Sequence, residues 1–152
     1  MLDKIDTLIE QHKDQAGGLL PLLHAVQDAL GYVPSEAVPA IATGFNLSRA
    51  EVHGVISYYH HFRKDRPGRT VVQVCRAESC KACGADALLA EVERRLGIKV
   101  HETRADGAVS LEPVFCLGLC AQSPAIQIDK RLYAGVTPER LSVLLSGVEV
   151  SA

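Results

Sequence analysis

The sequence predicts an α/β protein in which a small N-terminal helical bundle precedes a domain of short strands and helices. Up to residue 62, apolar residues recur every three or four positions, the spacing of amphipathic helices. Beyond the polar segment at residues 63–69, which contains a Pro-Gly turn signal, short β-rich runs alternate with helical patterns. We therefore expect a helical bundle at residues 1–65 and an α/β domain at residues 66–152.

The N-terminal part is expected to form about four helices. Its apolar stripes lie at residues 2–9, 19–30, 38–42 and 52–59. Gly17-Gly18 is expected to end the first helix, and Ser35 to cap the third. Ser48-Arg49-Ala50-Glu51 is a capping-box sequence, with Glu three residues after Ser, and predicts the start of the fourth. These apolar stripes are more extensive than a small bundle would bury alone. We therefore expect the bundle to dock on a partner subunit.

The C-terminal part is expected to follow the order β-α-β-β-β-α. The predicted elements are a strand at 70–75, a helix at 84–96, strands at 98–103 and 109–115, a hairpin of strands 125–128 and 131–134, and a final helix from 137 that ends at Gly147. Thr137-Pro138-Glu139 is a strong helix start, because it combines a capping hydroxyl, a first-turn proline and an acid at the positive end of the helix dipole. This order describes a thioredoxin-like sheet with helices packed on it.

Composition and charge narrow the functional classes. The 152 residues are 47% hydrophobic and 22% charged, with a net charge of −2, so no basic footprint for nucleic acid is present. No apolar run approaches the roughly 20 residues that span a bilayer, and the acid-containing N-terminus is unlike a secretory signal. We expect a cytoplasmic protein with no direct membrane insertion and no nucleic-acid partner.

All five cysteines fall in two groups, one of Cys75, Cys80 and Cys83 and one of Cys116 and Cys120. In a reducing compartment, clustered cysteines bind metal or do redox work more often than they form disulfides. Cys75 and Cys116 are each expected to end a strand, and Cys80 is expected in the loop between Cys75 and the following helix. Loops that follow strands can meet at one edge of a sheet, and four thiolates there would hold an iron–sulfur cluster or zinc.

Spacing leaves several ligand sets open. One is a [2Fe–2S] cluster on Cys75, Cys80, Cys116 and Cys120. A second uses Cys75, Cys80, Cys83 and Cys116, the spacing of plant-type ferredoxins, although Cys83 is expected at the first turn of the following helix and Cys120 would then have no role. A third places zinc on any four of the cysteines. A fourth hypothesis is a redox-active Cys80-Lys81-Ala82-Cys83 pair.

Further motifs accompany the cysteines: Leu20–Asp28, Gly31–Pro34, Val52–Tyr59, Cys116-Leu117-Gly118-Leu119-Cys120 and Thr137-Pro138-Glu139. Together these motifs cover nearly the whole chain and resemble the thioredoxin-like [2Fe–2S] ferredoxin family. That family includes the 24-kDa subunit of respiratory complex I and related subunits of NAD-linked hydrogenases and formate dehydrogenases. The resemblance implies a [2Fe–2S] cluster on Cys75, Cys80, Cys116 and Cys120, and it leaves Cys83 outside the ligand set.

Within the family, the short chain and the stretch from His53 to Arg63 most resemble the gamma subunit of soluble NAD-dependent formate dehydrogenases. This resemblance implies a non-catalytic electron-transfer subunit with an FMN- and NAD-binding partner and a molybdenum-containing formate dehydrogenase subunit in the assembly. No Gly-rich phosphate motif or nucleophile–base arrangement is evident, so no catalytic residue is predicted in this chain. The alternatives are the equivalent subunit of an NAD-linked hydrogenase or of complex I, and a zinc-binding interaction module.

Overall fold

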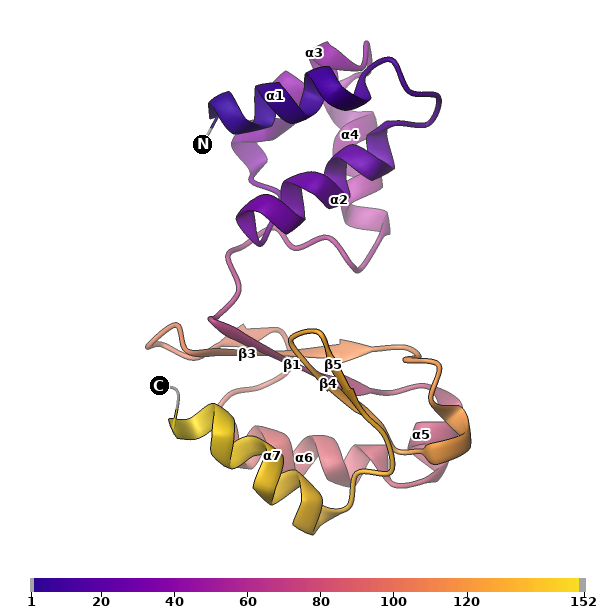
Figure 1. Cartoon of the computed structure of the whole chain (residues 1–152), viewed down its shortest axis with the longest axis vertical. Coiled ribbons are helices and arrows are strands. Elements are labelled where there is room, and N and C mark those ends of the chain that lie inside the picture. Colours follow the sequence, from indigo (N-terminus) through magenta and orange to yellow (C-terminus); the bar gives the residue numbers. More distant parts are fainter. Residues whose placement is uncertain (1, 151–152) are drawn as a thin grey trace. The chain divides into compact units, whose positions relative to one another are not determined.

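A computed structural model describes residues 2–150 of the chain (Figure 1). The chain divides into two compact units, the first ending at Arg66 and the second beginning at Pro67. Among the described residues, no helix is both long enough and apolar enough to cross a membrane. Each unit has its own apolar core.

The first unit is a helical bundle. Its elements are α1 (Leu2–His12), α2 (Leu19–Leu30), the 3-10 turn η1 (Ser35–Ala37), α3 (Val38–Gly44) and α4 (Arg49–Tyr58). One buried core joins them, formed by Ile5, Ile9, Leu22, Leu23, Val26, Val33, Ala37, Ile41, Ala42, Val52, Ile56 and Phe62. The expectation that the stripes exceed what the bundle can bury is wrong, because these residues and the half-buried leucines around them pack against one another within the unit.

Helix ends in this unit follow local signals in one case and depart from them in two. The predicted capping box is confirmed: Glu51 N donates to Ser48 Oγ at 3.1 Å, and Ser48 N donates to Glu51 Oε2 at 2.8 Å. α1 already ends at His12, well before Gly17. Ser35 makes no side-chain cap, because it belongs to η1 itself, which leads directly into α3.

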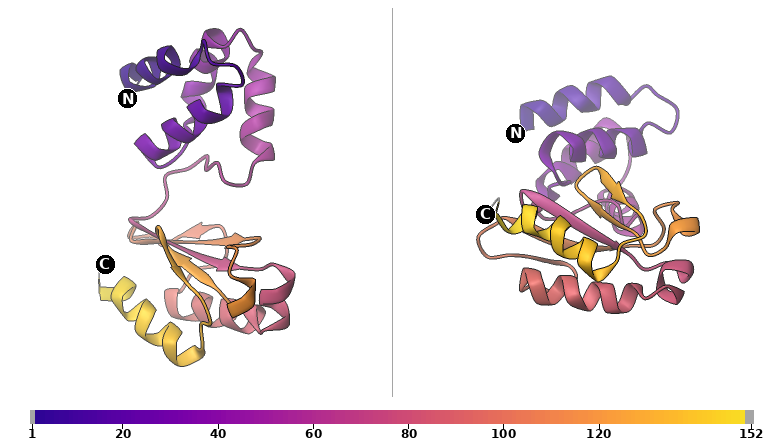
Figure 2. Two further views of the ribbon diagram at one scale, coloured as in Figure 1. Left: turned by 45° about the vertical axis from the view of Figure 1, so that its right-hand side comes forward. Right: turned by 60° about the horizontal axis from the view of Figure 1, so that its bottom comes forward.

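The second unit is built on a five-stranded mixed sheet with the strand order β2-β3-β1-β4-β5. The strands are β1 (Thr70–Cys75), β2 (Glu102–Thr103), β3 (Val109–Val114), β4 (Ile126–Ile128) and β5 (Arg131–Tyr133). β1 runs parallel to β3 and antiparallel to β4, and the outer pairs are antiparallel. The helices α6 (Ala85–Leu96) and α7 (Pro138–Val150) cover one face (Figure 2). The predicted α/β fold class is confirmed.

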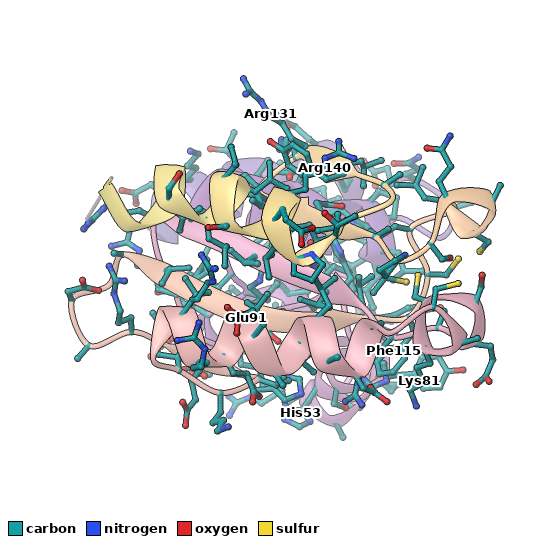
Figure 3. All side chains as sticks on the ribbon, turned by 90° about the horizontal axis from the view of Figure 1, so that it is seen from below. His53, Lys81, Glu91, Phe115, Arg131 and Arg140 are labelled. Carbon is teal, nitrogen blue, oxygen red and sulfur yellow. The ribbon has the colours of Figure 1, made fainter. Side chains whose placement is uncertain are left out.

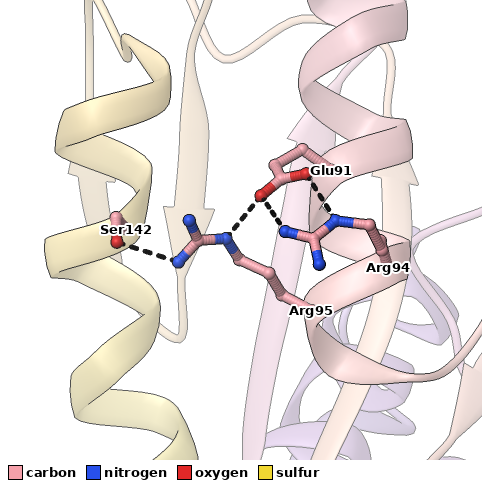
Figure 4. A network of polar contacts seen from close by, with 4 residues as sticks. All are labelled: Glu91, Arg94, Arg95 and Ser142. Carbon is pink, nitrogen blue, oxygen red and sulfur yellow. Dashed lines mark hydrogen bonds and ion pairs between the residues drawn. The ribbon is translucent and has the colours of Figure 1, made fainter.

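The core of this unit lies between the sheet and the two long helices. Its buried residues are Val72, Val74, Leu88, Leu89, Val92, Leu96, Ile98, Val109, Leu111, Ile126, Val136, Leu141, Leu145 and Val148. A polar network also links the helices: Glu91 accepts hydrogen bonds from Arg94 and Arg95, and Arg95 Nη1 donates to Ser142 Oγ at 2.9 Å (Figure 4).

Three predicted elements of this unit differ in the structure. The strand expected at 98–103 shrinks to β2, because His101 has a φ of +69° and interrupts extended backbone. A five-residue helix, α5 (Glu78–Ala82), occupies the stretch expected to be a loop. α7 continues through Gly147 to Val150, since a helical glycine weakens a helix without ending it. The hairpin at Asp129-Lys130 and the helix start at Thr137 are confirmed.

Candidate metal centre

The first cysteine pair is held in the interior of the second unit. Cys75 is the last residue of β1, and Cys80 lies within α5 rather than in the expected loop. Each is 2% exposed, and both pack against Ala85 and Ala125. A strand end and a one-turn helix therefore bring two thiols five positions apart into one apolar pocket.

The second pair follows β3, with Cys116 in the loop and Cys120 at the start of the 3-10 turn η2 (Cys120–Gln122). The Sγ atoms of Cys116 and Cys120 are 3.8 Å apart, and both residues are exposed. Gly118 has a φ of +74°, a conformation that favours glycine, and its N–H donates to Cys116 Sγ at 3.3 Å. Cys116 itself has a φ of +141°, which side-chain-bearing residues rarely adopt. The loop is thus bent so that both thiols face the same point.

The spacing within this pair matches two ligands on one metal. Thiolates bound to a tetrahedral metal at about 2.3 Å lie about 3.8 Å from each other. The sulfur atoms of the unit gather at one end of it, near the labelled residues Lys81 and Phe115 (Figure 3). The Cys116–Cys120 distance is therefore already that of a metal-ligand pair.

Two serine hydroxyls connect the pairs. Ser79 Oγ and Ser123 Oγ each donate to the backbone carbonyl of Cys120, at 3.2 and 3.0 Å, and lie 2.9 Å from each other. Cys80 Sγ lies 3.5 Å from Ser123 Oγ. The sequence interpretation missed both serines. The only signal for them was their position, one directly before Cys80 and one three residues after Cys120.

Burial and backbone donors act in opposite directions on the first pair of thiols. Burial, aided by the contact with Cys80, raises the pKa of Cys75, although the Ala77 and Leu117 N–H groups oppose it. At Cys80, burial raises the pKa, but hydrogen bonds with the Ser123 and Cys75 side chains and one from the Ala125 N–H outweigh burial, so the pKa is lowered. These N–H groups point at sulfur and would stabilise it once it carries negative charge.

Cys120 responds to the other cysteines around it. Its hydrogen bond with Cys116, followed by the charge of Cys116, burial and the charge of Cys80, raises its pKa. The pKa of Cys120 is therefore affected by one cysteine of its own pair and by one of the other pair. A bound cation would remove the repulsion between these cysteines, because its charge compensates the negative charge of neighbouring thiolates.

The donor set suits a binuclear iron–sulfur centre. A [2Fe–2S] cluster takes two thiolates on each iron, and the structure holds four thiols as two pairs, one buried and one exposed. Backbone N–H groups reach all four sulfurs. Within residues 2–150, no three His, Cys, Asp or Glu side chains are grouped closely enough to surround a single metal ion.

Cys83 belongs to neither of the two cysteine pairs. It is the C-cap of α5, not the first turn of the next helix, because Gly84 with a φ of +91° separates α5 from α6. Its exposed side chain borders a groove of about 370 Å³ lined also by Leu88, Val136 and Leu141. The exclusion of Cys83 from the ligand set remains a prediction.

Charged and aromatic residues near the two units' cysteines and helices have partners of their own. Arg76, directly after Cys75, forms an ion pair with Asp86 at 3.0 Å, which offsets its charge. His60 and His61 lie beyond the end of α4. The ring of His24 lies 5.0 Å from those of His61 and Phe62, so His24 packs in an aromatic cluster of the first unit.

A mixed sheet with two helices on one face defines a thioredoxin-like protein, and two cysteine pairs at one end of it are suited to binding a metal through thiolates. The chain belongs to the thioredoxin-like [2Fe–2S] ferredoxin family, whose model matches residues 5–149. Its cofactor is therefore a [2Fe–2S] cluster, as the sequence resemblance predicts.

The names of three similar proteins describe them as subunits of NADH-quinone oxidoreductases or of a hydrogenase. The chain is 32% identical to a subunit of the NADH-quinone oxidoreductase of Pseudomonas aeruginosa over 93% of this chain and 85% of the relative. It is 37% identical to NADH-quinone oxidoreductase subunit 2 of Thermus thermophilus, covering 86% and 72%. It is 30% identical to the NADP-reducing hydrogenase subunit HndA of Solidesulfovibrio fructosivorans, covering 91% and 81%.

The fold recurs in a solved structure. A chain of the NAD+-reducing [NiFe]-hydrogenase in the H2-reduced state superposes with a TM-score of 0.74 at 24% identity. The match covers 89% of this chain but only 22% of the hydrogenase chain. The likeness shows that this arrangement of elements also occurs as one part of a much longer polypeptide.

Proposed function

We propose that the chain is an electron-transfer subunit whose [2Fe–2S] cluster is held by Cys75, Cys80, Cys116 and Cys120. The observation that carries this proposal is the pairing of these thiols at one end of the second unit, with 3.8 Å between the sulfurs of Cys116 and Cys120. When bound, such a cluster accepts and releases one electron at a time.

The residues around the thiols divide the site into two sides. Cys75 and Cys80 are buried and anchor the centre in the core, whereas Cys116 and Cys120 are exposed on the loop. Phe115, directly before this loop, is 64% exposed. A redox partner would approach from the exposed side, because that side brings it nearest to the sulfurs.

The proposed partner is a subunit that binds FMN and NAD. A hydride carries two electrons, whereas the cluster passes one, so a flavin has to stand between nicotinamide and this chain. The names of the relatives support this partner, since they denote subunits of NADH-quinone oxidoreductases and of an NADP-reducing hydrogenase. No catalytic residue is assigned to this chain itself.

At the finer level, we propose a cytoplasmic NAD-dependent formate dehydrogenase, with a molybdenum-containing subunit in the assembly. Its support is the similarity of the stretch from His53 to Arg63 to the gamma subunit of such enzymes. The second candidate is the equivalent subunit of an NADH-quinone oxidoreductase or NAD-linked hydrogenase, which the names of the relatives favour.

The test of the cluster is anaerobic purification of the full chain, followed by iron and sulfide analysis and electron paramagnetic resonance after dithionite reduction. We expect about two irons and two sulfides per chain and a signal from a reduced [2Fe–2S] cluster. A colourless protein with about one zinc would establish the zinc-binding interaction module instead.

The test of the assembly is co-purification with a tagged chain from its native cells. The captured complex is assayed for NAD+ reduction by formate, for NAD+ reduction by hydrogen, and for quinone reduction by NADH. Formate-dependent activity together with bound molybdenum supports the finer proposal. Activity with hydrogen or quinone alone overturns it in favour of the second candidate.

A further inference from the structure

The hydroxyl of Ser123 is shared among three polar groups. Its Oγ lies 3.5 Å from Cys80 Sγ, 3.0 Å from the carbonyl oxygen of Cys120 and 2.9 Å from Ser79 Oγ. Ser79 Oγ also lies 3.2 Å from the same carbonyl. The two serines come from segments 44 positions apart, so this contact exists only in the folded unit.

Counting hydrogens shows how this arrangement must change when Cys80 binds metal. In the free chain, the Cys80 thiol donates to Ser123. A metal-bound cysteine is a thiolate and has no hydrogen to donate. The hydrogen between Sγ and Oγ must then come from Ser123. The carbonyl of Cys120 keeps a donor, because Ser79 already reaches it. Two hydroxyl hydrogens thus match two acceptors, the Cys80 thiolate and the Cys120 carbonyl.

We propose that Ser123 is a positioning residue that raises the reduction potential of the cluster by donating a hydrogen bond to the Cys80 thiolate. This inference rests on the proposed function. Hydrogen bonds to ligand sulfurs favour the reduced form, because that form carries the additional negative charge. Cys80 is 2% exposed, and burial strengthens such a bond because water cannot compete for it. Ser79 supports the geometry by relieving Ser123 of the Cys120 carbonyl.

The experiment measures the midpoint potential of the full chain, purified anaerobically, by a mediated redox titration followed by electron paramagnetic resonance. Ser123→Ala should lower the equilibrium constant for reduction about tenfold, which for a one-electron couple is a shift of about 59 mV to more negative potential. Ser123→Thr keeps the hydroxyl and should restore most of the potential. Ser146→Ala removes an α7 hydroxyl that bonds only to its own helix, at Val143 O, and should leave the potential unchanged.

Ser79→Ala serves as a second variant in case Ser123→Ala does not retain a cluster. Without Ser79, the Cys120 carbonyl competes for the hydrogen of Ser123, so the potential should fall by a smaller amount. A wild-type potential in Ser123→Ala overturns the inference, and so does a wild-type potential in Ser79→Ala where Ser123→Ala does not retain the cluster. A wild-type chain that contains no iron and sulfide overturns the proposed function instead, so the two failures are distinguishable.

Discussion

The backbone N–H of Arg63 donates a 2.7 Å hydrogen bond to Oε1 of Gln27, an α2 side chain that is only 7% exposed. The side-chain amide of Gln27 also donates, through Nε2, to the carbonyl oxygen of His61 at 2.8 Å. Gln27 thus holds the backbone on both sides of Phe62, which is buried in the core of the first unit. A buried side chain on one helix therefore fixes the segment that leaves the bundle after α4.

Replacing Gln27 with Ala should release this segment. Two partly buried hydrogen bonds would be lost, at about 0.5–1.5 kcal/mol each, or about 1–3 kcal/mol together in the free energy of unfolding of the bundle. Native-state hydrogen exchange should show the loss directly at the Arg63 amide. Gln11→Ala, on the exposed side of α1, is the matched control and should leave that amide protected. Equal protection in both variants would contradict the role of Gln27.

Substitution of single cysteines tests the ligand assignment. Cys83→Ser should retain the cluster, because Cys83 caps the end of α5 and borders a different groove. Serine at Cys75, Cys80, Cys116 or Cys120 should lower the iron content or change the resonance spectrum. Iron and sulfide analysis of each purified variant provides the measurement. Loss of the cluster in Cys83→Ser, with retention in Cys120→Ser, would restore the plant-type ligand set.

Local signals predicted much of the fold because their causes are local. The Ser48–Glu51 capping box and the turn at Asp129-Lys130 depend only on neighbours a few positions away, and both form as expected. Cys75 could be placed at a strand end because β1 has the apolar pattern of a buried strand. The segment from Cys116 to Cys120 could also be recognised from its own residues, because it has two cysteines on either side of Gly118.

Features that depend on distant contacts could not be predicted in this way. α5 has five residues, too few to show a helical period, and its place is set by packing of Cys80 against Ala85 and Ala125. β2 has only two residues because His101, directly before it, has a φ of +69°, a backbone conformation that its residue type does not indicate. The Ser79–Ser123 contact has no signature in either segment alone, so the link between the two cysteine pairs emerged only from the fold.

Glu91 is expected to make the second unit sensitive to acid. Hydrogen bonds from Arg94 and then Arg95 lower the pKa of Glu91 from 4.5 to about 2. A carboxyl group with a lowered pKa stabilises the fold fully above its unfolded pKa, and this contribution is lost as the pH falls from about 4.5 towards 2. Titration of the Glu91 side-chain carboxyl by nuclear magnetic resonance provides the measurement.

Salt and substitution provide the controls for this effect. The pairs are partly exposed, so 1 M salt should move the Glu91 pKa back towards its ordinary value. Glu91→Gln should reduce the loss of stability between pH 5 and pH 3, measured by urea unfolding. A pKa of Glu91 that stays near 4.5 at low salt would show that the network with Arg94 and Arg95 does not persist in solution.

Gly68 and Gly147 should respond in opposite ways to the same change. A Cβ atom at Gly68 would lie 2.7 Å from the backbone carbonyl carbon of Val109, and the Gly68 N–H donates to buried Ser110 Oγ at 2.7 Å. Since rigid β3 backbone would have to move, Gly68→Ala should destabilise the unit by about 1–3 kcal/mol.

At Gly147 within α7, a Cβ atom meets nothing within 4 Å, so Gly147→Ala should stabilise the unit by about 0.5–1 kcal/mol. Hydrogen exchange of the buried β1 and β3 amides reports on this unit alone. Wild-type protection in Gly68→Ala would mean that β3 yields more easily than its place between β1 and β2 implies.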